Sequence, residues 1–272
     1  MKSILSPLFD EEARFRLSKE AAFYDEVYRS NRYASFANVE QHFAGAQLTR
    51  FVDEYSIAGQ RCLEVGSGRG VFQDLVDDYT GVDLSESVAS CYRKPFVAAS
   101  AEELPLTDSN FDVVWSITVL EHIPNPEQAL REMRRVLKHN GLLYLQPAWN
   151  CRSWICEGIP VRPYSALSLR QKLIKFTLPI RDSLLFRAAF ALPRRLLRSV
   201  IGFFGKTEHL KFVKLPADYA TFWMVDSDAC SSIDPFDAIQ WFKSQGDLVL
   251  SHPRWLDAFL SRSEPLIVQV RK

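Results

Sequence analysis

Apolar residues along the chain follow two alternating patterns, which together predict an α/β fold. Short apolar runs rich in β-branched and aromatic residues are typical of buried strands, and the segments between them have apolar residues at helical spacing. Repeated alternation of this kind indicates a parallel, doubly wound sheet. The pair Asn140-Gly141 is a signal for a helix C-terminus. Strands are expected at about 61–66, 79–83, 96–99, 112–117 and 141–147, with helices at about 70–77, 85–93 and 126–139.

The same patterns continue on both sides of this region. Helices are expected over about 10–28 and 39–55, and another begins after Asp234, an N-cap residue followed by proline at the first helical position. Two more strands are expected at 246–251 and 266–270. The expected units are N-terminal helices at 1–58, a core at 59–148, a helical insertion after the fifth strand at 149–232, and a C-terminal completion of the core sheet at 233–272.

Three glycines at alternate positions follow the first expected strand. Gly66, Gly68 and Gly70 have no Cβ, so the loop can take positive φ and a ligand can approach its backbone closely. A strand, a glycine turn and a helix in this order open a nucleotide-binding βαβ unit. Asp83 ends the second expected strand, where a ribose would present its hydroxyl groups. The alternative for Asp83 is to cap the following helix.

The spacing around these glycines narrows the class of nucleotide. The dinucleotide fingerprint requires a third glycine where this chain has Val71, and the absence of a following Lys-Ser or Lys-Thr pair excludes a P-loop. Glu64 precedes the first glycine. Its carboxylate would repel a pyrophosphate but attract a ligand that carries an ammonium or sulfonium charge. The alternative is that Glu64 stabilises the loop by accepting hydrogen bonds from backbone amides.

The run Glu64-x-Gly66-x-Gly68-x-Gly70 followed by Asp83 resembles the first two motifs of class I S-adenosylmethionine-dependent methyltransferases. Further segments are similar in order and spacing, and the loop after the fourth strand resembles that of the ubiquinone/menaquinone-biosynthesis type, called type 11. These segments are 98–106, 111–117, 119–126 and 129–145, so that the resemblance covers roughly 60–148.

The resemblance implies a Rossmann-like, doubly wound sheet of seven strands with an antiparallel last strand, the two C-terminal strands forming its closing hairpin. It also implies that the N-terminal helices cover the cofactor, with Tyr24, Tyr28 and Tyr33 as candidate lid aromatics. Packing of these rings on the sheet is the alternative. S-adenosylmethionine is the implied cofactor, and its implied binding residues are Glu64, Gly66, Gly68, Gly70, Asp83, Leu84, Ser100, Ala101, Glu102 and Ile117.

One position departs from the family pattern. Ser100 replaces the usual aspartate of the segment that contacts the adenine in this family. The hydrogen bond from that aspartate to the adenine amino group is therefore not expected here. Recognition of the adenine is expected to be weaker, or to depend on the Ala101 amide and the Glu102 side chain.

Methyl transfer to a hydroxyl acceptor needs a base, and histidine has the side-chain pKa closest to neutral pH. His122 follows the fourth strand, where the family's loop faces the methyl group, and is the candidate catalytic residue. A loop histidine bonded to the backbone is the alternative, and Glu121 is a weaker candidate. Some related quinone O-methyltransferases look like divalent-cation binders through an E-V-L-E-H run, but Thr118 stands at its first position here. Because two ligands make a poor site, no metal is expected.

The chain is neutral overall, but its charge is unevenly distributed. Residues 151–215 contain 13 Lys and Arg but three acidic residues, and the remainder has an equal excess of negative charge. Residues 166–204 combine these cations with apolar residues at helical spacing, with breaks expected at Pro179 and Pro193. Two interpretations remain open: peripheral contact with an anionic membrane, or a substrate cap that packs its apolar face on the domain. Nucleic-acid binding is not expected.

Composition and cysteines bear on location. A hydrophobic content of 47% supports a buried core. Five cysteines include no C-x-x-C pair, and their odd number indicates reduced thiols in a cytoplasmic protein. Residues 1–7 lack the apolar stretch of a secretory signal, and no run of 18 apolar residues occurs. The expected location is the cytoplasm, with peripheral contact at the inner face of the membrane as an addition.

Together these observations predict an S-adenosylmethionine-dependent methyltransferase that acts on a small or lipid-linked acceptor, with O-methylation first among the reaction types. Quinones, polyprenyl-linked glycans, lipids and secondary metabolites all remain open as acceptors. Two other classes compete. One is a non-catalytic, membrane-peripheral protein with the same fold, which Ser100 slightly favours. The other is a nicotinamide-dependent oxidoreductase, which Glu64 and Val71 disfavour.

Overall fold

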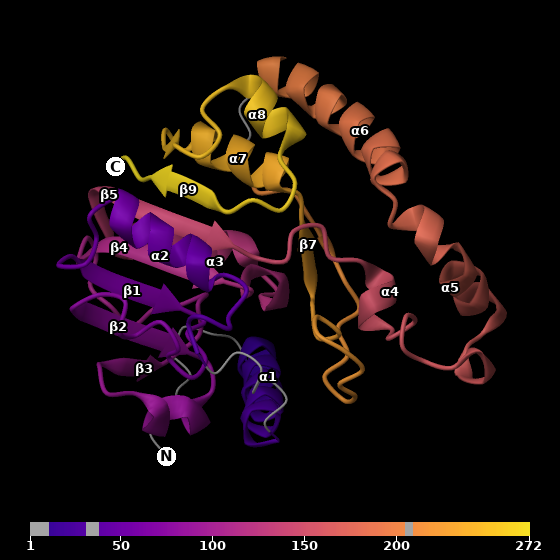
Figure 1. Ribbon diagram of the computed structural model, residues 1–272, viewed down its shortest axis with the longest axis horizontal. Helices are drawn as coiled ribbons and strands as arrows, with labels where there is room; N and C mark the ends of the chain where they lie inside the picture. Colours follow the sequence, from indigo (N-terminus) through magenta and orange to yellow (C-terminus); the bar gives the residue numbers. More distant parts are fainter. Residues whose placement is uncertain (1–10, 31–37, 205–208) are drawn as a thin grey trace.

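Seven strands form one mixed sheet, shown in the computed structural model of Figure 1. The structure describes residues 11–30, 38–204 and 209–272. The strand order is β3-β2-β1-β4-β5-β9-β8. The first five strands in this order pair in parallel with their neighbours, and β9 pairs antiparallel with both β5 and β8. The predicted Rossmann-like sheet is confirmed. Its strands are β1 (Arg61–Val65), β2 (Asp78–Asp83), β3 (Phe96–Ala98), β4 (Phe111–Ile117), β5 (Leu137–Gln146), β8 (Leu248–Val249) and β9 (Leu266–Gln269).

The central strands are buried on both faces, which explains their continuous apolar sequence. In β4, for example, Val113, Val114 and Trp115 are fully buried. Parallel pairing aligns the strand ends: Val65 of β1 pairs with Val82 of β2, and β4 lies on the other side of β1. The loops that follow β1, β2 and β4 therefore meet at one edge of the sheet.

Helices cover both faces of the sheet. On one face, Met133, Phe236 and Trp241 pack in the larger hydrophobic core, and on the other Phe51 packs against Tyr144. In Figure 1, α1 stands beside the carboxyl ends of β1 and β2. The helices of this part are α1 (Glu11–Arg29), α2 (Gly45–Glu54), α3 (Pro126–Val136), α7 (Pro235–Ser244) and α8 (Trp255–Leu260).

The predicted N-cap of α7 is confirmed, because the Asp234 carboxylate accepts a hydrogen bond from the Phe236 amide at 3.0 Å. Two predicted helices beside β2 are wrong. Residues 71–77 form turns. A helix of seven residues would have fewer than two turns, and most of its backbone amides and carbonyls would lack a partner within the helix. Instead the side-chain Nε2 of Gln73 donates to the carbonyls of Gly70 and Cys91. The second segment forms only a short 3₁₀ helix, η2 (Glu86–Cys91).

The predicted helix end at Asn140-Gly141 is also wrong. Helix α3 ends at Val136, and β5 follows directly. Asn140 has a φ of 64° and its amide donates to the Val270 carbonyl, within an irregular stretch of β5 where the pairing with β4 shifts. Gly141 is required there because a Cβ would lie 3.0 Å from the Asp112 carbonyl oxygen. The two residues therefore form a strand irregularity in which Asn140 has left-handed backbone, and this has the same sequence signature as a helix cap.

The insertion after β5 leaves the sheet and returns to it at α7. Its helices α5 and α6 extend to one side of the molecule in Figure 1. Pro179 and Pro193 lie inside these helices, so the predicted breaks are wrong. Both prolines are exposed, where water can bind the carbonyl that proline leaves unpaired. The elements are α4 (Ser153–Cys156), η4 (Tyr164–Ala166), α5 (Leu169–Arg181), α6 (Leu184–Phe204), β6 (Phe212–Lys214) and β7 (Ser231–Ile233).

Strands β6 and β7 form an antiparallel pair of three residues each, too short for an alternating pattern to predict. Between them, residues 215–230 return over the carboxyl edge of the main sheet, where the Cys230 amide donates to the Glu121 carbonyl. Among the described residues, none of the helices has the length and apolarity needed to cross a bilayer.

Candidate active site

A cavity of about 240 Å³ lies at the carboxyl edge of the sheet. The loops after β1, β2, β3 and β4 form its floor, α1 forms one wall, and two residues of the insertion, Val225 and Asp226, close it. The expected cofactor residues that line it are Glu64, Gly66, Gly68, Asp83, Leu84, Ser100, Ala101, Glu102 and Ile117, and His122 lines it as well. The structure therefore brings almost the whole predicted set to one cavity.

The glycine loop takes the backbone conformation that its sequence predicts. Gly66 and Gly68 have φ of 74° and 49°, a region that favours glycine. A Cβ on Gly66 would lie 2.1 Å from a methyl carbon of Val119, so the loop also packs against the segment after β4. Gly70 has a φ of 67°, but it contacts the ring of Tyr92 and lies outside the cavity wall. Its position indicates a role in loop packing.

Asp83 holds the glycine loop from the second strand. Its Oδ2 accepts the Gly68 amide at 2.8 Å, and its Oδ1 accepts the Ser85 amide at 2.9 Å. The side chain lines the cavity, and burial raises its pKa. Each carboxylate oxygen can accept a second hydrogen bond. Asp83 can therefore order the loop and still accept a ligand hydroxyl, so its two predicted roles are compatible.

Glu64 lies beneath the same loop and is fully buried. Burial raises its pKa to about 8, an effect that a hydrogen bond from the Tyr79 hydroxyl partly offsets. A carboxyl group with this pKa is largely protonated at neutral pH while the cavity is empty. A cationic ligand beside it would favour the ionised form.

The loop after β3 lines another part of the cavity. Ser100 Oγ accepts the Glu102 amide at 3.2 Å, so it serves the loop itself. Both oxygens of Glu102 also have partners: Asn125 donates its amide at 2.9 Å, and Arg16 donates from α1 at 2.8 Å. Glu102 thus fastens the N-terminal helix to the core.

Helix α1 closes the cavity through its aromatic face. Tyr24 and Tyr28 line the cavity, whereas Tyr33 lies outside the described residues. The Tyr24 hydroxyl donates to Asp228 at 2.8 Å, and Phe23 meets Tyr219 edge-to-face at 5.5 Å between centroids. The N-terminal helix and the returning segment of the insertion therefore meet above the site.

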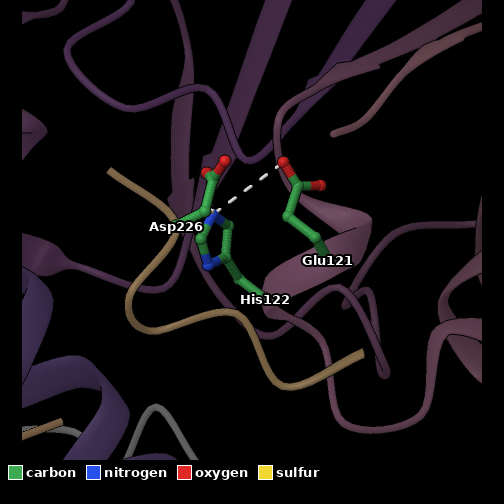
Figure 2. A group of neighbouring side chains, drawn as sticks. All are labelled: Glu121, His122 and Asp226. Atoms are coloured by element: carbon green, nitrogen blue, oxygen red, sulfur yellow. Dashed lines mark ion pairs between the residues drawn. The ribbon is translucent and has the colours of Figure 1, made fainter. Parts of the chain in front are cut away.

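The acceptor side of the cavity is a cluster of charged groups around His122. Figure 2 shows its ring beside the carboxylates of Glu121 and Asp226. The Nε2 atom lies 3.8 Å from Asp226 and 3.9 Å from Glu121, and Nδ1 lies 3.1 Å from the Asp228 carboxylate. Glu121 is held in place by the Ala148 amide, which donates to its Oε1 at 3.0 Å.

These contacts set the protonation of the cluster. Burial alone lowers the pKa of His122, but the three carboxylates outweigh it, Asp228 most strongly, and raise the pKa to about 10. Burial raises the pKa of Glu121 to about 7 and also raises that of Asp226, whereas His122 outweighs burial at Asp228 and lowers its pKa. At neutral pH, His122 is therefore an imidazolium paired chiefly with Asp228.

Glu121, His122 and Asp226 offer ligand atoms that all lie within 4.8 Å of one another. Sequence reasoning counted two of these side chains, because Asp226 comes from the insertion. The His122 ring lies within 4 Å of both carboxylates, so we interpret the set as an ion-pair cluster. The absence of a required metal stays a prediction.

Sequence reasoning missed two acidic residues that line this cavity, Glu20 and Asp226, and a third, Asp228, that pairs with His122 beside it. Asp226 and Asp228 lie in an insertion without a recognisable motif, and Glu20 is one of many charged residues on α1. Glu20 lines the cavity, and burial raises its pKa to about 7 against the opposing charge of Arg16. The local sequence around these residues carries no signal that could have identified them.

Comparison with known proteins finds relatives of the core of the chain. Residues 63–145 match a family model described as a methyltransferase domain. A ubiquinone biosynthesis O-methyltransferase of Pseudomonas aeruginosa is 30% identical over 113 residues, covering 35% of this chain and 47% of that protein. A phthiotriol/phenolphthiotriol dimycocerosates methyltransferase of Mycobacterium ulcerans is 30% identical over 144 residues, covering 46% and 53%.

Among solved structures, a methyltransferase of Thermotoga maritima covers 94% of this chain and 99% of its own, at 18% identity and a TM-score of 0.45. The chain spans about half the length of the curated relatives it matches. Residues 63–145 form a class I S-adenosylmethionine-dependent methyltransferase domain of type 11. The matched region begins in β1 and ends in β5, so it includes the glycine loop, Asp83 and His122 but neither α1 nor the segment with Asp226 and Asp228.

Proposed function

We propose that the protein transfers a methyl group from S-adenosylmethionine to a small or lipid-linked acceptor, with O-methylation as the reaction. The observation that carries this proposal is the donor end of the cavity, where the glycine loop, Asp83 and Glu64 meet. The sulfonium of the bound donor supplies the reactive methyl group. The protein's part is to hold donor and acceptor close, aligned and shielded from water.

The donor end suits this ligand in shape and in charge. The Asp83 carboxylate accepts hydrogen bonds from the Gly68 and Ser85 amides and from the Tyr28 side chain, and its remaining lone pair can accept a ribose hydroxyl. Glu64 places an ionisable carboxyl group at the loop, where it would pair with a positive charge on the donor. A pyrophosphate would gain no such pairing and would oppose ionisation of the same carboxyl group, which disfavours a nicotinamide cofactor.

His122 is the residue that deprotonates the acceptor hydroxyl in this proposal. Its side chain lines the cavity at the acceptor end, and Asp228 at Nδ1 leaves Nε2 for the acceptor. Because the carboxylates raise the pKa of His122 to about 10, the neutral, proton-accepting imidazole becomes more populated as the pH rises. The rate of methyl transfer should therefore increase through the alkaline range.

The acceptor class rests on relatives and on the insertion. The names of two relatives refer to ubiquinone biosynthesis and to phthiotriol dimycocerosates. We extend this to a small or lipid-linked acceptor here, and we include peripheral membrane contact through residues 166–204 as the means of reaching it. The apolar, basic sequence of that segment supports this part of the proposal.

Calorimetric titration with S-adenosylmethionine tests the donor assignment. We expect saturable binding with a Kd of roughly 1 µM to 1 mM, the usual range of KM values for enzymes. Absence of binding at millimolar donor would refute the proposal. Enhancement of NADH fluorescence by the protein would instead support the oxidoreductase. Transfer of a labelled methyl group into membrane extracts then identifies the acceptor and the atom that is methylated.

A further inference from the structure

Helix α5 presents a continuous apolar stripe to solvent. Leu169, Leu173, Phe176 and Ile180 recur at the spacing of a single helical face. Their exposed fractions are 85%, 62%, 76% and 61%. No residue of this helix is buried. The stripe therefore has no partner within the described part of the chain.

Helix α6 continues the exposed apolar surface. Leu185, Leu196 and Val200 share one face at helical spacing, and Leu185 is 83% exposed. A different face of the helix is attached to the protein: the buried Arg195 guanidinium bonds to Asp234 at 2.6 Å and to the Phe259 carbonyl at 2.6 Å. Because Arg195 fixes that face against α7 and α8, the apolar face points away from the domain.

Such a surface requires an explanation. Single exposed apolar residues are normal, but large contiguous patches mark a site of interaction. The α5–α6 surface, as we name it, consists of the large apolar residues of these helices that are at least half exposed. They are Leu169, Leu173, Phe176, Ile180, Leu184, Leu185, Phe190, Leu196, Leu197, Val200 and Ile201.

The charges around this surface indicate its partner. The basic residues of α5 are Arg170, Lys172, Lys175 and Arg181, and Asp182 is the one acid between the two helices. On α6, Arg194, Arg195 and Arg198 pair with Asp234 and Asp237 of the domain, and Arg187 pairs with Asp182, so the cations beside the surface are chiefly those of α5. On α5, Arg170 and Lys172 flank the apolar stripe on opposite sides, as their places along the helix require. Apolar residues bordered by cations suit an anionic lipid interface, where the apolar face enters the acyl boundary and the cations meet phosphates.

We propose that the α5–α6 surface binds the interface of an anionic lipid bilayer. A second copy of the chain is a poorer occupant, because symmetric pairing would bring two strongly basic surfaces together. The helices lie on the membrane and do not cross it, in keeping with their length and composition. The segment that bears Asp226 belongs to the same insertion, so membrane contact holds the acceptor end of the cavity near the lipid. The lipid contact deepens the membrane contact included in the proposed function, and this last step also rests on the methyltransferase assignment.

Flotation of the purified full-length protein with vesicles tests the proposal. We expect binding to vesicles of equal parts phosphatidylglycerol and phosphatidylcholine, weakened by 0.5 M salt, and little binding to phosphatidylcholine alone, since screening weakens exposed charges. The variant Leu173→Ser/Phe176→Ser should bind at least tenfold more weakly. The matched control is Phe15→Ser/Val213→Ser, whose side chains are exposed to 62% and 57% but lie outside the surface, and it should bind normally.

Binding of S-adenosylmethionine, which does not involve this surface, shows that each variant is folded and separates this proposal from the proposed function. Wild-type flotation of Leu173→Ser/Phe176→Ser would overturn the proposal. So would a dimer in light scattering that the same double substitution dissociates, because a second copy would then be the occupant. Failure of vesicle binding together with normal donor binding would leave the methyltransferase assignment intact.

Discussion

The two ends of the cavity are built in different ways. The donor end comes from consecutive strand ends within residues 64–102, and much of it is backbone geometry, fixed by glycines and by the amides that Asp83 accepts. The acceptor end joins three segments distant in sequence: α1, the loop with His122, and the returning insertion with Asp228. Its properties come from buried charges that interact across these segments.

This difference shows which end of the cavity belongs to the region shared with the family. All members of the family use the same methyl donor, so one loop geometry can be kept while the acceptor changes. The acceptor end is assembled by parts outside the matched region of residues 63–145, together with His122. Changes at the proposed donor end should therefore alter or abolish donor binding, whereas changes at the proposed acceptor end should alter rate and pH dependence while the donor still binds.

The largest effect is expected for Gly66→Ala. A Cβ at this position would lie 2.1 Å from Val119 and would force an alanine into positive φ, so the loop must move. We expect loss of measurable S-adenosylmethionine binding and a stability loss of about 2–4 kcal/mol, of the size seen for overpacking and strained backbone. Calorimetric titration and thermal unfolding measure the two effects.

Gly59→Ala is the matched control for that substitution, because nothing lies within 4 Å of its Cβ and its φ is not positive. It should bind the donor like the wild type. Donor affinity that survives Gly66→Ala would show that the glycine loop does not shape the donor end, and the contrast between the two ends would fail.

The next effect is expected for His122→Asn, which should lower the rate of methyl transfer about 10²–10⁴-fold, the usual contribution of a general base. Donor affinity should change little, because His122 lies at the acceptor end. The control is His209→Asn, a histidine whose side chain is 79% exposed. Equal loss of donor binding and rate in His122→Asn would contradict the division of roles.

The fold could be predicted from the sequence to a large extent, and for a physical reason. Strands buried on both faces have continuous apolar runs, and the three glycines identify the loop after β1 without any tertiary information. Some predictions were wrong because one local sequence signal is compatible with two structures. Asn140-Gly141 forms a strand irregularity instead of a helix cap, and the prolines of α5 and α6 lie within helices on exposed faces instead of breaking them.

The candidate site divides in the same way. Sequence reasoning could identify the cavity residues that follow β1, β2 and β3 because their signals are local, a carboxylate or a glycine at a strand end. The partners of His122 could not be identified in this way, because Asp228 is more than a hundred residues away and gains its role only when α1 and the insertion close together. Long-range pairing of charges leaves no periodicity in the sequence.

Asp83→Ala should weaken donor binding by about 10- to 100-fold, since two buried amides lose their acceptor, at about 1–3 kcal/mol each, and the ribose loses a partner. The effect is smaller than that of Gly66→Ala because the loop keeps its glycines. Asp78→Ala, at the exposed start of the same strand, is the control and should bind normally. Unchanged donor affinity in Asp83→Ala would limit Asp83 to a capping role.

Asp228→Asn should move the pH profile of methyl transfer. Asp228 is the main group that raises the pKa of His122, so its neutralisation lowers that pKa, and the neutral imidazole becomes populated at lower pH. We expect the alkaline rise in rate to shift to lower pH by about 1 unit, at the low end for an opposite charge within contact distance. A pH profile that coincides with the wild type would show that Asp228 serves only to hold the fold.

The smallest effect concerns Glu64 and returns to the donor end, where charge adds to backbone geometry. Burial raises the pKa of Glu64 to about 8, so below pH 8 a cationic donor must displace a proton from it. Donor affinity should therefore increase with pH, by up to about tenfold per unit, and level off above pH 8, because one proton is released on binding. Titrations at several pH values should show this slope for the wild type and a flat profile for Glu64→Gln. A slope that persists in Glu64→Gln would assign the released proton to another group, and the donor end would then depend on its loop geometry alone.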